Sequence, residues 1–171
     1  MAKLFIQTLP THEELKQSAS ELYPQVEADS LYTHLLFRKV ATDLEAKFDN
    51  FFAQYQLSPG RYTLLIILRK APHGLMPSEM AQKVGVTQAT ISGLINSLEK
   101  AELVARETHN KDGRAFVIKL TAKGHALIKT LAPEYYSRLQ DFWSQFPESE
   151  KTQLKSSLER MISNMDKLRM K

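Results

Sequence analysis

The sequence contains no cysteine among its 171 residues. This absence excludes disulfides, thiolate metal sites, cysteine nucleophiles and cysteine redox switches. No run of about 18 apolar residues occurs, so we expect no transmembrane helix and no membrane partner. The first ten residues, MAKLFIQTLP, hold one Lys and too short an apolar stretch for a secretory signal. We therefore expect a cytoplasmic protein.

Motifs for catalysis and for cofactors are also missing. The sequence has no Gly-rich phosphate loop, no nucleophile elbow and no pattern of paired carboxylates. Its histidines form no His-Glu-x-x-His motif and no pair four residues apart, so a zinc site would require tertiary assembly. These scattered residues are His12, His34, His73, His109 and His125. We expect a protein that is not an enzyme and that holds no cofactor or metal.

The basic residues are concentrated in the middle of the chain. Residues 56–123 hold ten Lys or Arg against five Asp or Glu, whereas residues 1–55 hold five against eight. A basic middle between less basic flanks is typical of a module that binds a polyanion. On charge alone, an ordinary solvated surface is the favoured explanation of the same distribution.

Two long amphipathic segments flank this middle part. We expect Asp29 or Ser30 to cap a first helix of roughly 25 residues, whose apolar positions fall on more than one side. Pro147 starts a last helix with an apolar seam at spacings of four, three, four and three, as in a coiled coil. The seam consists of Leu154, Leu158, Met161, Met165 and Leu168. Packing within the same chain is one explanation, and a contact between subunits is the one that we favour.

The middle part has helix-start and helix-stop residues in a regular order. Ser58-Pro59 starts one helix, Pro77 starts a short one, Gly85 stops it, and Thr87 caps the next. Two strands follow, covering 103–108 and 115–120, joined by the turn HNKDGR. A further helix begins after Thr121, and Pro133 should kink or break it. This order predicts a helix-turn-helix followed by a basic hairpin, or wing.

The second helix of that motif has two unlike faces. Ile91, Leu94, Ile95 and Leu98 form an apolar face, and the opposite face carries small and polar residues. Such a face lets a helix backbone enter a major groove, and Asn96 would pair with adenine through both polar atoms of its amide. We expect the DNA contacts of this helix from Thr87, Gln88, Ala89, Thr90, Ser92, Gly93, Asn96 and Lys100. An ordinary solvated helix is the alternative.

The hairpin supplies the remaining candidates for DNA contacts. Lys111, Asp112 and Arg114 lie at its tip, and Arg106 lies on its first strand. An Arg on a narrow tip suits a minor groove, where A·T tracts concentrate negative potential. Asp112 would repel phosphate unless it is paired, so we expect it to hold an Arg in position.

From Leu57 to Gly124 the sequence resembles the MarR family of winged-helix transcription regulators. The matching segments are LSPGRYTLL, SEMAQKVGVTQATISGLINSLEKAELVAR and DGRAFVIKLTAKG. The last contains the wing signature of the family, at Asp112, Arg114, Leu120, Thr121 and Gly124. Glu102 departs from the pattern, because the family often has Gly there. A left-handed Glu costs about 1–2 kcal/mol, so we expect a differently built connection.

The resemblance implies a homodimer that binds a pseudo-palindromic operator in double-stranded DNA. It also implies a small, often aromatic and anionic, effector that binds between the dimer base and the winged domains and releases the DNA. His34 and Arg38 lie one turn apart on the first long helix, and with Tyr62 they would line such a pocket. A surface His and a surface Arg without that role are the alternative.

These observations predict a mainly α-helical protein with a small β-hairpin wing. The expected parts are an N-terminal extension (1–28), a helical dimerisation region (29–56 and 122–171) and a winged helix-turn-helix DNA-binding domain (57–121). The predicted function is a dimeric, sequence-specific transcriptional regulator, a repressor released by a small molecule. The alternative is a winged-helix module that binds proteins and not DNA.

Overall fold

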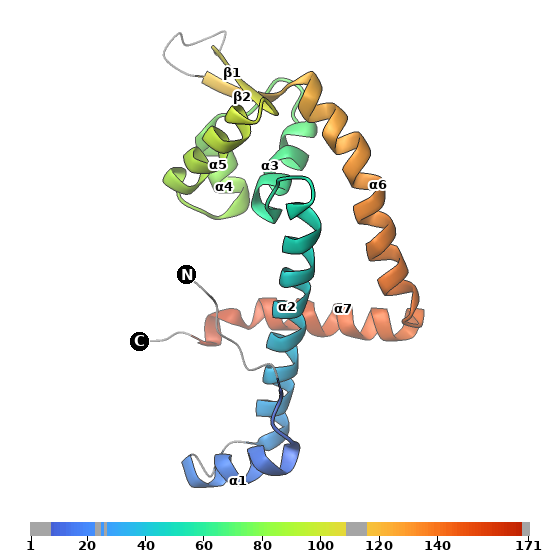
Figure 1. The fold of residues 1–171 in the computed structure, drawn as a ribbon. Helices are drawn as coiled ribbons and strands as arrows, with labels where there is room; N and C mark the ends of the chain where they lie inside the picture. Colours follow the sequence, from blue (N-terminus) through green and yellow to red (C-terminus); the bar gives the residue numbers. More distant parts are fainter. Residues whose placement is uncertain (1–7, 23–24, 26, 109–115, 169–171) are drawn as a thin grey trace.

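The computed structural model describes residues 8–22, 25, 27–108 and 116–168 of the chain. It is mainly helical, with one antiparallel hairpin (Figure 1). The helices are α1 (His12–Leu22), α2 (Ala28–Ala53), α3 (Pro59–Arg69), α4 (Pro77–Val84), α5 (Gln88–Lys100), α6 (Ala122–Ser144) and α7 (Glu148–Ser163), and the strands are β1 (Val104–Thr108) and β2 (Phe116–Leu120). A short 3₁₀ helix, Met165–Leu168, follows α7. The predicted fold class is confirmed.

Side-chain caps begin α3, α5 and α6 where the sequence predicted them. In each case a hydroxyl oxygen accepts a hydrogen bond from the backbone N–H three residues later, at Ser58, Thr87 and Thr121. Gly85 ends α4 in the left-handed conformation, with φ 68°. The cap predicted for α2 is wrong, because Glu27 occupies that position without a side-chain cap bond. Asp29 instead bonds His12 of α1, with 2.8 Å between Oδ1 and Nε2.

The core of the winged unit is assembled from the inner faces of five elements. Its fully buried side chains come from α3, α4, α5, β2 and α6; they are Leu64, Leu65, Met80, Ile91, Ile95, Leu98, Ile118, Ile128 and Leu131. In the hairpin, Val104 is paired with Leu120 and Arg106 with Ile118. Leu75 forms an additional bridge to Ile118, which attaches the segment before α4 to the wing. This packing fixes α5 against the wing.

Aromatic rings connect the winged unit to the long helices. Phe52 of α2 stacks on Tyr62 of α3 with 4.7 Å between ring centroids, and Tyr135 of α6 lies 5.4 Å from each. Phe52 and Tyr62 are both buried. The core is therefore continuous across the boundaries expected at residues 57 and 121. Figure 1 shows α2 and α6 extending from this junction toward the end of the molecule where α1 and α7 lie.

The structure bears on two expectations about the backbone. Helix α6 continues through Pro133 to Ser144 and is not broken there. Pro133 and Lys129 are both exposed, so the Lys129 carbonyl that loses its intrahelical donor can bond water. The connection after α5 also follows the left-handed path, because Glu102 has φ 61°.

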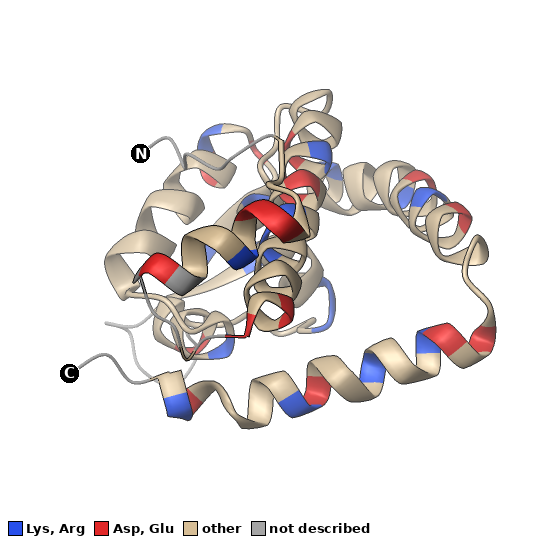
Figure 2. Cartoon of the chain, turned by 90° about the horizontal axis from the view of Figure 1, so that it is seen from below, with Lys and Arg blue, Asp and Glu red and all other residues tan. Residues whose placement is uncertain are grey.

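Helix α7 stands apart from the other helices in Figure 2 and carries charged residues of both signs. None of its residues is buried. The predicted apolar seam is consequently largely uncovered: Leu154, Met161, Met165 and Leu168 are all exposed, Leu168 to 74%. Packing against the same chain therefore does not explain the seam. Among the described helices, none combines the length and apolar character that crossing a membrane requires.

Candidate nucleic-acid interface

Helix α5 presents its polar face to solvent, as the sequence predicted. Ile91, Ile95 and Leu98 are buried beneath it, with exposures of 1% or less. All eight candidate DNA contacts at its start and along its outer side are exposed: Thr87, Gln88, Ala89, Thr90, Ser92, Gly93, Asn96 and Lys100. We call this set the outer face of α5. It contains no acidic side chain and its centre is made of small residues, so the helix backbone can approach a groove of DNA there.

The N-terminal end of α5 is open and polar. The Thr87 hydroxyl oxygen accepts from the Thr90 backbone N–H at 3.2 Å, and the two hydroxyl groups lie 3.0 Å apart. The other first-turn N–H groups have no acceptor within the helix, as at every helix start. They point out of the helix and carry the positive end of its dipole, which favours a phosphate or a base acceptor.

Gly93 lies at the centre of the outer face and has no packing reason to be glycine. A Cβ atom built there would meet no atom within 4 Å. Glycine in a helix interior costs about 0.5–1 kcal/mol relative to alanine. Glycine therefore lowers the stability of α5 at a position where no contact within the chain requires it. This is the pattern expected where another backbone approaches the helix closely.

Arg106 joins the first strand of the wing to α5. Its Nη2 donates to Oδ1 of Asn96 at 2.6 Å, and its Nε lies 3.2 Å from Oε2 of Glu99. The guanidinium carbon Cζ lies 5.0 Å from the centroid of the Phe116 ring. The sequence suggested that Asn96 and Arg106 would each contact DNA, and the structure shows that they contact each other. The sequence did not suggest that Glu99 and Phe116 contact Arg106. These residues lie on α5 and β2, and no sequence motif predicts how a helix and two strands pack together.

The predicted contacts at the tip of the wing, Lys111, Asp112 and Arg114, lie outside the described residues and stay predictions. The described strands below the tip carry an ion pair between Lys119 and Glu107, with 2.6 Å between Nζ and Oε2. This pair joins the two strands across the hairpin.

A pocket of about 630 Å³ opens beside the C-terminal end of α5. Its lining comes from the α2–α3 junction, α5, β1 and the first turns of α6, and consists of Tyr55, Gln56, Arg61, Ser97, Lys100, Ala101, Leu103, Lys123, Ala126, Leu127 and Thr130. Three of these residues are cations and none is an acid. The guanidinium of Arg61 is held by the hydroxyl oxygens of Ser58 and Ser97, at 3.3 and 3.1 Å.

Comparisons with known proteins agree on one family. The model of the MarR family matches residues 57–116. The transcriptional repressor YetL of Bacillus subtilis is 31% identical over 144 residues, which are 84% of this chain and 86% of YetL. This chain belongs to the MarR family. The transcriptional regulator PecS of Dickeya dadantii is 28% identical over 83% of this chain and 87% of PecS.

Solved structures of the family have the same fold. The MepR–DNA complex of S. aureus superposes with a TM-score of 0.69 at 28% identity, and covers 75% of this chain and 95% of MepR. The region shared with MepR therefore includes most of the chain. A family protein of this fold has been solved with its DNA bound.

The effector residues predicted for this MarR-family chain do not come together within one chain. Tyr62 is buried against Phe52, whereas His34 and Arg38 are exposed on α2. The 14 residues from Arg38 to Phe52 span roughly 21 Å of helix. Burial raises the pKa of the Tyr62 phenol, so it stays protonated at neutral pH. Tyr62 therefore belongs to the aromatic junction between the winged unit and the long helices.

The pocket beside α5 adjoins a hydrogen-bond network that the sequence did not suggest. The Tyr55 hydroxyl donates to a carboxylate oxygen of Glu134 on α6, and the other oxygen accepts from Arg138 at 2.7 Å. The Tyr55 hydrogen bond, followed by that from Arg138, lowers the pKa of the Glu134 carboxyl. The residues involved are 79 positions apart in sequence, which explains why no motif revealed them.

Proposed function

We propose that this MarR-family chain is a transcriptional repressor that binds double-stranded DNA as a homodimer. The observation that carries the proposal is the exposed outer face of α5, with an open helix start and a central glycine that packing does not require. The DNA-bound state of MepR and the repressor YetL support it. In this proposal the protein binds DNA and is not an enzyme. It would act in the cytoplasm, where the DNA is.

The proposed dimer is supported by the apolar surface that one chain leaves uncovered. Ile162 and Leu168 are 71% and 74% exposed, and Phe37, Val40 and Tyr136 of α2 and α6 are exposed as well. A monomer rarely keeps so many large apolar side chains in water. We infer that the same helices of a second copy cover them. A two-fold dimer would place two copies of α5 in major grooves one helical turn apart, about 34 Å, on a pseudo-palindromic operator.

We also propose that the pocket beside α5 binds a small aromatic anion that releases the DNA. The side chains of Arg61 and Lys100 supply positive charge, and Tyr55 and Leu127 supply apolar and aromatic surface, whereas Lys123 is paired with Glu102. Among the described residues, Lys100 has no ion-pair partner, so its charge is available to a ligand. The pocket touches the last turn of α5, which gives a ligand a direct way to change the position of this helix.

The first experiment is fluorescence anisotropy on duplex DNA from upstream of the protein's own gene, with an unrelated duplex as control, at several salt concentrations. We expect binding of the upstream duplex in preference to the control, with log affinity falling linearly against log salt concentration. Weak and equal binding to both duplexes would contradict a specific site in that region. No binding at low salt would instead favour the module that binds proteins.

The effector is tested with benzoate and with salicylate, added to the preformed complex and, separately, titrated into the free protein by calorimetry. We expect Arg61→Gln to weaken binding of the carboxylate by roughly tenfold, as expected for one charge-assisted contact. Lys129→Gln is the matched control, because it removes one positive charge from α6 outside the pocket. Equal loss in both variants would assign the effect to net charge and not to the pocket.

A further inference from the structure

The contact between Asn96 and Arg106 restricts how Asn96 can recognise a base. A guanidinium only donates hydrogen bonds, so the amide atom that faces it must be the oxygen. The 2.6 Å contact therefore fixes the orientation of the amide, with Oδ1 toward Arg106. One of the two lone pairs of Oδ1 is taken by Arg106, whereas the Nδ2 amino group keeps both of its donors.

Three contacts hold Arg106 in this position. The Glu99 carboxylate pairs with Nε, the Phe116 ring lies against Cζ, and Arg106 is paired with Ile118 in the ladder of the hairpin. Glu99 lies one turn after Asn96 on α5, so the guanidinium bridges two residues of the helix from outside it. A planar group held on two edges and one face loses little further freedom when DNA binds.

We infer that Arg106 is a positioning residue that makes Asn96 select guanine in place of adenine. The inference rests on the proposed DNA-binding function. Pairing of Asn with adenine requires both Oδ1 and Nδ2, because adenine offers one acceptor, N7, and one donor, N6. Oδ1 already accepts from Arg106, so the adenine donor would have to share this oxygen with a guanidinium, whereas both hydrogens of Nδ2 remain to donate. Guanine offers two neighbouring acceptors, N7 and O6, which suit an amino group that only donates.

The inference gives Arg106 a role different from a direct DNA contact. A side chain whose Nη2, Nε and ring face are all engaged by the protein acts on the base through Asn96. Loss of Arg106 would free Oδ1 and restore the pairing of Asn96 with adenine. A residue needed only for folding, or only for its charge, would lower affinity for all sequences alike and leave the base preference unchanged.

The test is selection of bound sequences from a randomised duplex library, with the parent protein, Arg106→Met and Asn96→Ala. Methionine keeps an unbranched side chain over Phe116 and removes every donor. The base pair at which Asn96→Ala no longer prefers one base identifies the base that Asn96 contacts. We expect guanine there for the parent and adenine for Arg106→Met, with the other positions unchanged. Lys119→Met is the matched control, since it removes one positive charge from the same hairpin, and it should keep guanine.

A second measurement does not depend on how well Arg106→Met folds. In the selected duplex, the guanine opposite Asn96 is replaced by 7-deazaguanine, which lacks the N7 acceptor. The parent should bind this duplex roughly fivefold to tenfold more weakly, the loss expected for one hydrogen bond, and Asn96→Ala should bind both duplexes equally. Preference of the parent for adenine, or the same base selected by the parent and by Arg106→Met, would overturn the inference while leaving DNA binding intact. Absence of any enriched sequence for the parent would overturn the proposed function as well.

Discussion

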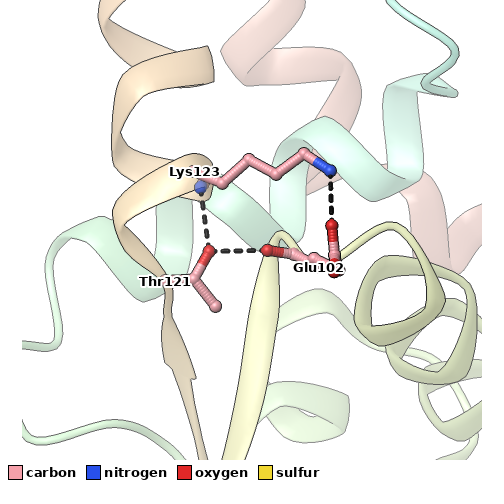
Figure 3. A network of polar contacts seen from close by, with 4 residues as sticks. Glu102, Thr121 and Lys123 are labelled. Carbon is pink, nitrogen blue, oxygen red and sulfur yellow. Dashed lines mark hydrogen bonds and ion pairs between the residues drawn. The ribbon is translucent and has the colours of Figure 1, made fainter.

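The ammonium group of Lys123 lies 2.9 Å from Oε2 of Glu102, across the junction between the last turn of α5 and the first turn of α6 (Figure 3). Thr121 completes this junction, because its hydroxyl donates to the Glu102 carbonyl oxygen at 2.7 Å and accepts from the Gly124 backbone N–H at 3.0 Å. The backbone of Glu102 is thus held in the left-handed conformation by contacts on both sides. A residue that disfavours this conformation is tolerated because its side chain and its carbonyl group both find partners.

Glu102→Gly should stabilise the protein by about 1 kcal/mol. The left-handed conformation costs a non-glycine residue roughly 1–2 kcal/mol, and glycine adopts it without that cost. The ion pair that is lost is solvent-exposed, and such pairs contribute little. The measurement is urea unfolding at neutral pH, with Glu102→Ala as the control that loses the ion pair and keeps the strain. A glycine variant less stable than the parent would mean that the ion pair outweighs the strain.

Gly93→Ala should raise stability by about 0.5–1 kcal/mol and weaken DNA binding. The added methyl group meets open space in the free protein, but it lies on the outer face of α5, where DNA would approach. Thermal unfolding and anisotropy on the same preparation measure the two effects. Gly124→Ala is the contrasting variant, since its Cβ would stand 2.2 Å from the Leu103 carbonyl oxygen and should destabilise the fold. Unchanged DNA affinity in Gly93→Ala would argue against close approach at this position.

Tyr55→Phe should raise the pKa of the Glu134 carboxyl toward its ordinary value of 4.5. A carboxyl whose pKa is lowered by folding stabilises the protein above its ordinary pKa, and this contribution disappears as pH falls through the lowered value. The variant should therefore lose less stability than the parent on acidification below about pH 4.5. Carboxyl carbon shifts in an NMR titration report the pKa directly. Glu102 is an internal reference, because Lys123 lowers its pKa independently of Tyr55. An unchanged Glu134 titration would contradict the prediction.

Ile162→Glu should raise the dissociation constant of the dimer by at least roughly tenfold. The side chain is 71% exposed in one chain and lies on the apolar side of α7, where a buried carboxylate would face the partner's apolar residues. Analytical ultracentrifugation over a concentration series measures the equilibrium. Ser156→Glu places the same charge on the opposite side of α7 and should leave the dimer intact. Equal dissociation in the two variants would remove α7 from the interface.

Local chemistry predicted the middle of the fold well. Three helices are capped by Ser58, Thr87 and Thr121. Each cap joins residues only three positions apart, so the sequence itself predicts the contact. Gly85 at the end of α4 follows from the same kind of rule. The exposure of the outer face of α5 was also predictable, because helical periodicity alone separates it from the buried Ile91 and Ile95.

Contacts between distant elements could not be predicted in the same way. The hydrogen bond between Asn96 and Arg106 depends on how the wing packs against α5, and the bond from Tyr55 to Glu134 depends on how the turn after α2 packs against α6. Whether Pro133 breaks α6 could not be predicted from the sequence for a similar reason. The cost of a proline in a helix depends on whether the unpaired carbonyl faces water or core, and the sequence does not show on which side of α6 it falls.

Unbroken continuity of α6 through Pro133 makes this helix a lever. Its 23 residues form a rod of about 34 Å, with the wing and α5 attached at one end and α7 at the other. A tilt of 5° about the α7 end would displace the opposite end by roughly 3 Å, which is close to the 3.4 Å spacing of successive base pairs. In the proposed dimer, a small rotation at the α7 end would thus be amplified into a shift of about one base pair at the DNA.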